Sequence, residues 1–201
     1  MNDNYHHGDL KNALIWAGIE ILSKEGMQAL SLRNVAKKAG VSHAAPYAHF
    51  ADKQALIAAI ATEGYKKLYQ RLVAVQGNQN DPLARLIEIA QAYVQFAIDE
   101  PDHFKITFSG VVEAEKDHPE YVEQSKRCFA LVVAAVADCQ KKEVLPRSDS
   151  QLVTVSLWAC IHGFVQLVLA NQLPSTLIAQ YSVMELFNFH LKLFLQSAMS
   201  L

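Results

Sequence analysis

The chain of 201 residues has few of the patterns that would place it among secreted proteins, metalloproteins or enzymes. It has only three cysteines, Cys128, Cys139 and Cys160, an odd number without the spacing of metal ligands. We interpret them as buried thiols of a protein in a reducing cytoplasm. Residues 1–7 are polar and contain no apolar signal core. The sequence therefore predicts a cytoplasmic protein without a metal or other cofactor.

Catalytic patterns are also missing. None of the eight histidines pairs with carboxylates at the spacing of a metal site. The chain contains neither a nucleophile elbow nor a glycine loop of the kind that cradles phosphate. We expect no catalytic and no metal-binding residues. A helical enzyme stays open only as an alternative, which turnover assays would distinguish.

The charge balance excludes a general polyanion binder, because the net charge is −2. The charge is uneven along the chain, however. Residues 1–56 hold six basic and five acidic side chains, a net charge of +1, and the remainder has a net charge of −3. A mildly basic N-terminal region predicts at most modest, salt-sensitive affinity for polyanions.

The longest apolar run, residues 152–169, is long enough to span a membrane. It contains four polar residues, Thr154, Ser156, His162 and Gln166. A helix that is apolar on nearly every side is also typical of the interior of a protein. Since the rest of the chain has the pattern of a soluble protein, we favour a buried helix and expect no membrane partner.

The whole chain is predicted to be α-helical, with about nine helices, because it shows no strand alternation, internal repeat or low-complexity tract. Proline and capping residues mark the helix boundaries, of which Asp81-Pro82 is the clearest. Besides two short helices that begin near Ser31 and Ser42, the expected spans are 9–24, 53–76, 82–99, 101–109, 119–142, 149–171 and 175–199.

Residues 26–53, here the motif segment, have the layout of a helix-turn-helix. Gly26 can adopt positive φ without steric cost and so end a helix. Ser31 and Ser42 can accept hydrogen bonds from the first N–H groups of a helix, as Asp52 can for the helix that follows. Gly40 permits a tight turn between two short helices that cross steeply.

Apolar side chains at helical spacing predict a small core around this segment. A three-helix unit this short depends on such anchors, because it has few other side chains to bury. The expected core residues are Leu10, Leu14, Ala17, Ile21, Leu22, Leu32, Val35, Ala36, Ala39, Val41, Tyr47, Phe50, Leu56, Ile57, Ile60 and Ala61.

One set of residues stands at fixed offsets across three predicted helices: Ser31-Leu32-Arg33, Val35-Ala36, Ala39-Gly40-Val41-Ser42, Tyr47, His49-Phe50, Lys53 and Ala55-Leu56. This order resembles the TetR family of bacterial transcriptional regulators, over about the first third of the chain. Two positions depart from the usual family pattern. Ala48 replaces a larger residue, and Pro46 lies in the first turn of the expected recognition helix, where its missing N–H is tolerated.

The resemblance implies a DNA-binding surface for a double-stranded operator. The first residues of a recognition helix face the base edges of the major groove, and here they are Ser42, His43, Ala44 and Ala45. The family pattern places Tyr47, His49 and Lys53 on phosphates, and Arg33 is a further phosphate candidate. Considered alone, Tyr47 fits a core position equally well. Lys37 and Lys38 are expected to form a solvated basic face.

We expect two domains, a DNA-binding domain at 8–68 and an effector-binding and dimerisation domain at 69–201. Residues 158–163 resemble the Trp-His-Gly pattern of one C-terminal domain type in this family. Trp158 and His162 are four residues apart and so share a helical face. Binding pockets are mostly apolar with few polar anchors, although such clusters are often only core packing. The candidate pocket residues are Tyr93, Phe96, Phe104, Phe108, Trp158, His162 and Gln166.

The last helices are too apolar for a monomer. Nine of the thirteen residues from Val183 to Leu195 are apolar, whereas a surface helix needs one apolar stripe. Residues 149–171 show the same excess. The pattern predicts a homodimer through a four-helix interface with these candidate residues: Leu157, Ile161, Val165, Phe187, Leu191 and Phe194.

These expectations add up to a ligand-responsive regulator, a bacterial cytoplasmic repressor that a small apolar effector releases from its operator. Control by a protein or by abundance, without a small-molecule effector, stays open as an alternative. A ligand-dependent shift in melting temperature would distinguish the two.

Overall fold

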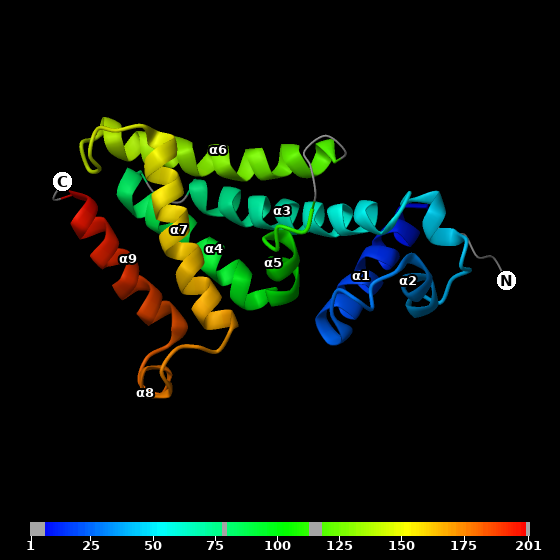
Figure 1. The fold of residues 1–201 in the computed structure, drawn as a ribbon. Helices are drawn as coiled ribbons and strands as arrows, with labels where there is room; N and C mark the ends of the chain where they lie inside the picture. The colour runs from blue at the N-terminus through cyan, green and yellow to red at the C-terminus, as the bar shows by residue number, and fades with distance from the viewer. Residues whose placement is uncertain (1–6, 78–79, 113–117, 200–201) are drawn as a thin grey trace. The chain divides into compact units, whose positions relative to one another are not determined.

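The computed structural model describes residues 7–77, 80–112 and 118–199, and within these ranges it contains helices and no strand (Figure 1). The prediction of an all-α fold is confirmed. The elements in chain order are α1 His7–Glu25, α2 Leu32–Lys38, the 3₁₀-helix η1 Ala45–Ala48, α3 Lys53–Gln76, α4 Pro82–Asp99, α5 Pro101–Thr107, α6 Pro119–Lys141, α7 Ser150–Leu169, α8 Ser175–Ile178 and α9 Val183–Met199.

Two of the predicted helices differ from the observed ones. The expected helix 175–199 is divided into α8 and α9 by residues 179–182. The expected recognition helix is a single 3₁₀ turn, η1, with Pro46 at its start. The proline ring supplies no N–H and fixes φ near −65°, which suits the first turn of a helix but not its interior.

The described chain forms two compact units. Unit 1 contains the N-terminal helices up to Lys66 together with residues 102–125, and unit 2 contains residues 67–101 and the chain from Lys126 onward. The first boundary lies close to the expected one at residue 68. Residues 102–125 cluster with the N-terminal helices.

Unit 1 is built around α1, which is apolar on two sides. The predicted face is buried, with Leu14 at 0% exposure. Ile15 and Ile19 are buried as well, and they belong to the same apolar cluster as Ile106 of α5. The ring of Trp16 meets that of His103 edge-on at a centroid distance of 5.3 Å. The segment after residue 101 thus completes the core of the N-terminal unit.

Within unit 1, α3 and α5 approach closely at Gly64. A Cβ atom at this position would lie 1.9 Å from Oγ1 of Thr107. Next to this contact, the rings of Tyr65 and Phe108 meet at 5.5 Å. The missing side chain therefore permits the tight packing of the two helices.

Gly64→Ala is expected to destabilise the protein by about 1–3 kcal/mol, because the added methyl group forces the helices apart in a packed core. Thermal and urea unfolding measure the effect. The double variant Gly64→Ala/Thr107→Ala should recover part of the loss, because it removes the nearest atom. A fully stable Gly64→Ala variant would show that α5 is not packed in this way.

In unit 2, helices α4, α7 and α9 pack on one another (Figure 1). Their shared core includes five of the residues that we expected at the dimer interface: Leu157, Ile161, Val165, Phe187 and Leu191, each at most 5% exposed. Phe194 is half-buried. The assignment of the five to a subunit interface is wrong, since the single chain already buries them. An apolar pattern on two faces does not show which face meets the chain's own core.

The three thiols differ in their surroundings. Burial raises the pKa of Cys128 to about 12 and that of Cys139 to about 11, as expected for inert buried thiols. Cys160 is half-buried, and its Sγ lies 3.0 Å from Nε2 of His190.

One described helix, α7, is long and apolar enough to cross a membrane by length and composition. A core helix of a soluble protein can have the same length and composition, so these two properties alone do not indicate a membrane-spanning helix.

Candidate nucleic-acid interface and effector site

In the motif segment, most of the helix ends are formed by the capping and turn residues that the sequence predicts. Ser31 has extended backbone angles, and its Oγ accepts a hydrogen bond of 3.1 Å from the amide of Asn34. Gly26 and Gly40 have φ values of 80° and 70°, in the region that favours glycine. Oδ1 of Asp52 accepts a hydrogen bond of 2.8 Å from the amide three residues on. These residues place α2 and the start of α3 as the sequence predicts.

The cap predicted for Ser42 is wrong. The residue that caps η1 is Ala44, and no side-chain hydrogen bond closes this end. The backbone carbonyl of Ser42 accepts a bond from the amide of Ala45 at 3.0 Å. Because turns of this type pair each carbonyl with the amide three residues on, the hydroxyl of Ser42 is not needed for the cap.

The expected base-reading residues lie on the surface of unit 1. Ser42, His43 and Ala44 are exposed, whereas Ala45 is half-buried. Tyr47 is 62% exposed and therefore is not part of the small core, which was the alternative for this residue. Arg33 on α2 is exposed as well.

Two of the expected phosphate ligands are partly enclosed by the protein. Nζ of Lys53 donates a hydrogen bond of 2.7 Å to the carbonyl of Met27, in partly buried surroundings. An ammonium group has three N–H donors, so two of them stay available. Nε2 of His49 is enclosed and has no hydrogen-bond partner among the described residues. This nitrogen reaches a phosphate only if the ring moves.

Part of the basic surface of unit 1 is neutralised internally. Oε1 of Glu20 lies 2.7 Å from Nζ of both Lys24 and Lys38. These hydrogen bonds lower the pKa of Glu20 to about 2. Lys38 thus links α2 to α1 while its side chain stays 39% exposed, and Lys37 is exposed as well.

In unit 2, four of the seven candidate pocket residues form one hydrogen-bonded chain. Nε1 of Trp158 donates to the hydroxyl of Tyr93 at 3.1 Å, and this hydroxyl lies 2.8 Å from Nδ1 of His162. Nε2 of His162 lies 3.0 Å from Nε2 of Gln166. The three residues of α7 are spaced by four, so they share one face of the helix toward Tyr93 of α4.

Desolvation keeps this polar chain uncharged. Burial raises the pKa of Tyr93 and lowers that of His162, so the neutral forms of both are favoured at neutral pH. Trp158 and Gln166 are exposed in the single chain, while Tyr93 is buried. The cluster therefore offers neutral donors and acceptors between an apolar interior and the outer side of α7.

The other three candidates lie elsewhere. Phe96 is fully buried in unit 2, where the guanidinium carbon of Arg71 lies 5.6 Å from the centre of its ring. Phe104 and Phe108 belong to unit 1, and their rings are 4.7 Å apart. The contacts of these three residues are those of core packing, which was the alternative to a binding pocket.

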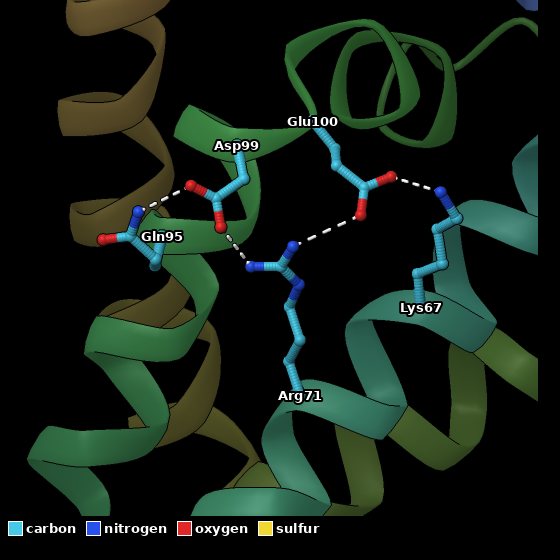
Figure 2. A network of polar contacts seen from close by, with 5 residues as sticks. All are labelled: Lys67, Arg71, Gln95, Asp99 and Glu100. Carbon is cyan, nitrogen blue, oxygen red and sulfur yellow. Dashed lines mark hydrogen bonds and ion pairs between the residues drawn. The ribbon is translucent and has the colours of Figure 1, made fainter.

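Sequence reasoning missed an ion-pair network between α3 and the end of α4 (Figure 2). Arg71 donates from Nη1 to Asp99 at 2.6 Å and from Nη2 to Glu100 at 3.2 Å. Lys67 pairs with the other oxygen of Glu100, and Gln95 donates to Asp99 at 2.7 Å. The only local signal was the i, i+4 spacing of two basic residues on α3, which does not identify their partners. We call these five residues the α3–α4 clamp.

Among the described residues, no group of three or more histidine, cysteine, aspartate or glutamate side chains has the arrangement of a metal site.

Comparison with known proteins accounts for both units. Residues 14–60 match the family model of bacterial regulatory proteins of the tetR family, and residues 86–194 match the tetracyclin repressor-like C-terminal domain. The chain is 30% identical over 99 residues to the uncharacterised HTH-type transcriptional regulator YobS of Bacillus subtilis, a match that covers 49% of this chain and 51% of that relative.

A longer match, 26% identical over 159 residues, is to the nicotine-responsive repressor HdnoR of Paenarthrobacter nicotinovorans, covering 76% of this chain and 81% of the relative. A solved structure from Rhodococcus sp. RHA1, described as a protein with unknown function, is 29% identical with a TM-score of 0.82. It covers 98% of this chain and is covered completely. The chain therefore belongs to the TetR family of DNA-binding transcriptional regulators, which are not enzymes.

Proposed function

We propose that the protein is a homodimeric repressor that leaves its double-stranded operator when a small molecule binds in unit 2. The observation that carries the small-molecule part is the hydrogen-bonded chain of Trp158, Tyr93, His162 and Gln166. Neutral polar groups at the edge of an apolar interior are typical of ligand pockets. The likeness to a nicotine-responsive repressor supports this reading.

The surface of unit 1 supports the DNA-binding part of the proposal. Ser42, His43, Ala44 and Ala45 would face the bases, and Tyr47 and Arg33 would bind phosphates. This base-reading face has few hydrogen-bond donors. Sequence preference would then depend also on DNA shape and on the spacing of two half-sites.

A second copy of the chain would cover the outer face of α7 and α9. This α7–α9 outer face consists of exposed apolar side chains: Leu152, Val155, Leu167, Phe189 and Leu193. Between them, a Cβ atom at Gly163 would meet nothing within 4 Å, so a helix of a partner can approach closely. A dimer presents two heads to half-sites about 34–36 Å apart or multiples of this. It also accounts for the apolar surface of α7 without a membrane, in a cytoplasmic protein.

The test begins with selection of bound duplexes from a random DNA library by the full-length protein. The selected duplex is then used in a release assay against a panel of uncharged aromatic and heterocyclic compounds. We expect at least one compound to lower duplex affinity and to raise the melting temperature of the free protein. If a duplex is selected and no compound releases it, regulation by a protein or by abundance replaces the effector part.

Tyr93→Phe is expected to weaken the response to a releasing compound about tenfold or more, because the shared hydroxyl orients both Trp158 and His162. Affinity for the selected duplex should stay within about threefold of that of the unaltered protein, since the residue lies outside the DNA-binding surface. Dose–response curves of duplex release measure the change. Tyr181→Phe, an exposed tyrosine in unit 2, is the matched control. An unaltered response in Tyr93→Phe would contradict the pocket assignment.

A further inference from the structure

The chain passes between the two compact units at three places. These are inside α3 between residues 66 and 67, after Pro101 at the end of α4, and inside α6 between residues 125 and 126. At each crossing, a charged side chain on the unit 2 side either belongs to α3 or contacts a residue of α3. Lys67 pairs with Glu100, and the guanidinium carbon of Arg127 lies 4.3 Å from the ring centre of Tyr69.

Arg71 is the centre of this arrangement (Figure 2). Its fork binds carboxylates of two successive residues, Asp99 at 2.6 Å and Glu100 at 3.2 Å. The guanidinium also lies over Phe96, one turn earlier on α4. A planar group that is held by two carboxylates and a ring fixes direction as well as distance, which a lysine does not.

The clamp is partly shielded from solvent. The side chain of Arg71 is 32% exposed, that of Lys67 28% and that of Glu100 23%, whereas that of Asp99 is 41% exposed. The hydrogen bond from Arg71 lowers the pKa of Asp99, so this carboxylate stays charged in mildly acidic solution. Two basic and two acidic groups balance one another. A shielded network of this kind holds its geometry better than an isolated surface pair.

The clamp and the candidate effector site share one helix. Tyr93 and Asp99 both lie on α4, six residues or about 9 Å apart along the axis. The opposite partner, α3, runs unbroken from Arg71 in unit 2 to Lys53 in unit 1. The clamp therefore joins α4, which carries Tyr93, to a helix whose first residues belong to the DNA-binding unit.

We propose that Arg71 is a positioning residue that makes α3 follow the C-terminal end of α4, and that it thereby fixes the half-site spacing that the dimer accepts. This inference rests on the proposed function, because it assumes a dimer that binds two half-sites. The clamp then determines how strongly duplex affinity depends on half-site spacing, whereas other residues make the contacts with DNA.

The test uses the selected duplex and a series in which one or two base pairs are added or removed between its half-sites. Affinities are measured for the full-length protein, for Arg71→Ala and for Arg71→Lys, which keeps the charge but not the planar fork. Arg147→Ala is the matched control, since Arg147 forms an exposed pair with Glu143 on the surface. The salt dependence of binding is measured in parallel.

We expect the unaltered protein and Arg147→Ala to lose about tenfold or more in affinity for each altered base pair, since half-site spacing is geometric. Arg71→Ala should lose about threefold or less, with an unchanged salt slope because no phosphate contact is removed. Arg71→Lys should also lose discrimination, because an ammonium group does not fix direction as the two-pronged guanidinium does. A merely stabilising role would change the melting temperature without changing the preference among spacers.

Two results would overturn the inference. One is full spacer discrimination by a folded Arg71→Ala variant, which leaves the proposed function intact. The other is failure of the unaltered protein to select any duplex, which removes the proposed function as well. If Arg71→Ala does not fold, Asp99→Asn, which keeps the size of the side chain, is measured in the same series.

Discussion

Phe189→Asp is expected to convert the protein to a monomer and to lower its affinity for the selected duplex by about a hundredfold or more, since two linked heads bind far more tightly than one. The phenylalanine is 65% exposed in the single chain, so the subunit itself loses little packing. In a dimer the new carboxylate would lie in an apolar interface without a partner. Light scattering after size-exclusion chromatography measures the mass, and fluorescence anisotropy measures the affinity.

Val73→Asp is the control for this change, because Val73 is 42% exposed on α3 and lies outside the α7–α9 outer face. It should leave both mass and affinity unchanged. Leu167→Asp, on the α7 side of the same face, should repeat the effect of Phe189→Asp. A dimer that persists in both variants would place the interface elsewhere.

Lys53→Ala is expected to weaken binding to all duplex sequences by about tenfold, and to reduce the slope of log affinity against log salt by about one unit. The structure adds a second effect. The ammonium donates to the carbonyl of Met27, so its loss also destabilises the unit by about 1 kcal/mol. Duplex titrations at several salt concentrations and thermal melts measure the two effects separately.

Lys37→Ala, which removes an exposed lysine of the same unit, should leave the melting temperature unchanged. A lower melting temperature in Lys53→Ala with an unaltered salt slope would make Lys53 purely structural. A loss confined to particular base sequences would show that the residue reads bases and not phosphates.

The features that sequence analysis predicted correctly are local ones. The Ser31 cap, the positive φ of Gly26 and Gly40, and the Asp52 cap each depend on residues within one turn. The i, i+4 spacing of Trp158 and His162 likewise placed them on one face with Gln166. Such signals are readable because the interacting groups are close in the chain.

The features that were missed depend on distant parts of the chain. Nothing in the spacing of Lys53 indicates that it binds Met27, 26 residues earlier. The partners of Arg71 are 28 and 29 residues away. For α7 and α9, apolar residues on both faces left the inner and outer sides undistinguished. Only packing against α4 showed that Leu157 and Phe187 face inward.

The place of α5 in unit 1 bears on how members of this family can be recombined. Cutting the chain after residue 68 would retain the whole helix-turn-helix but remove Ile106, which belongs to the same buried cluster as Ile15, and His103, whose ring meets that of Trp16 edge-on. The severed fragment would expose an apolar strip along α1. A chimera that is to keep this protein's operator preference therefore has to carry residues 102–125 along with the N-terminal helices. The compact unit that contains the helix-turn-helix is discontinuous in sequence, so its recombination points do not follow the order of the chain.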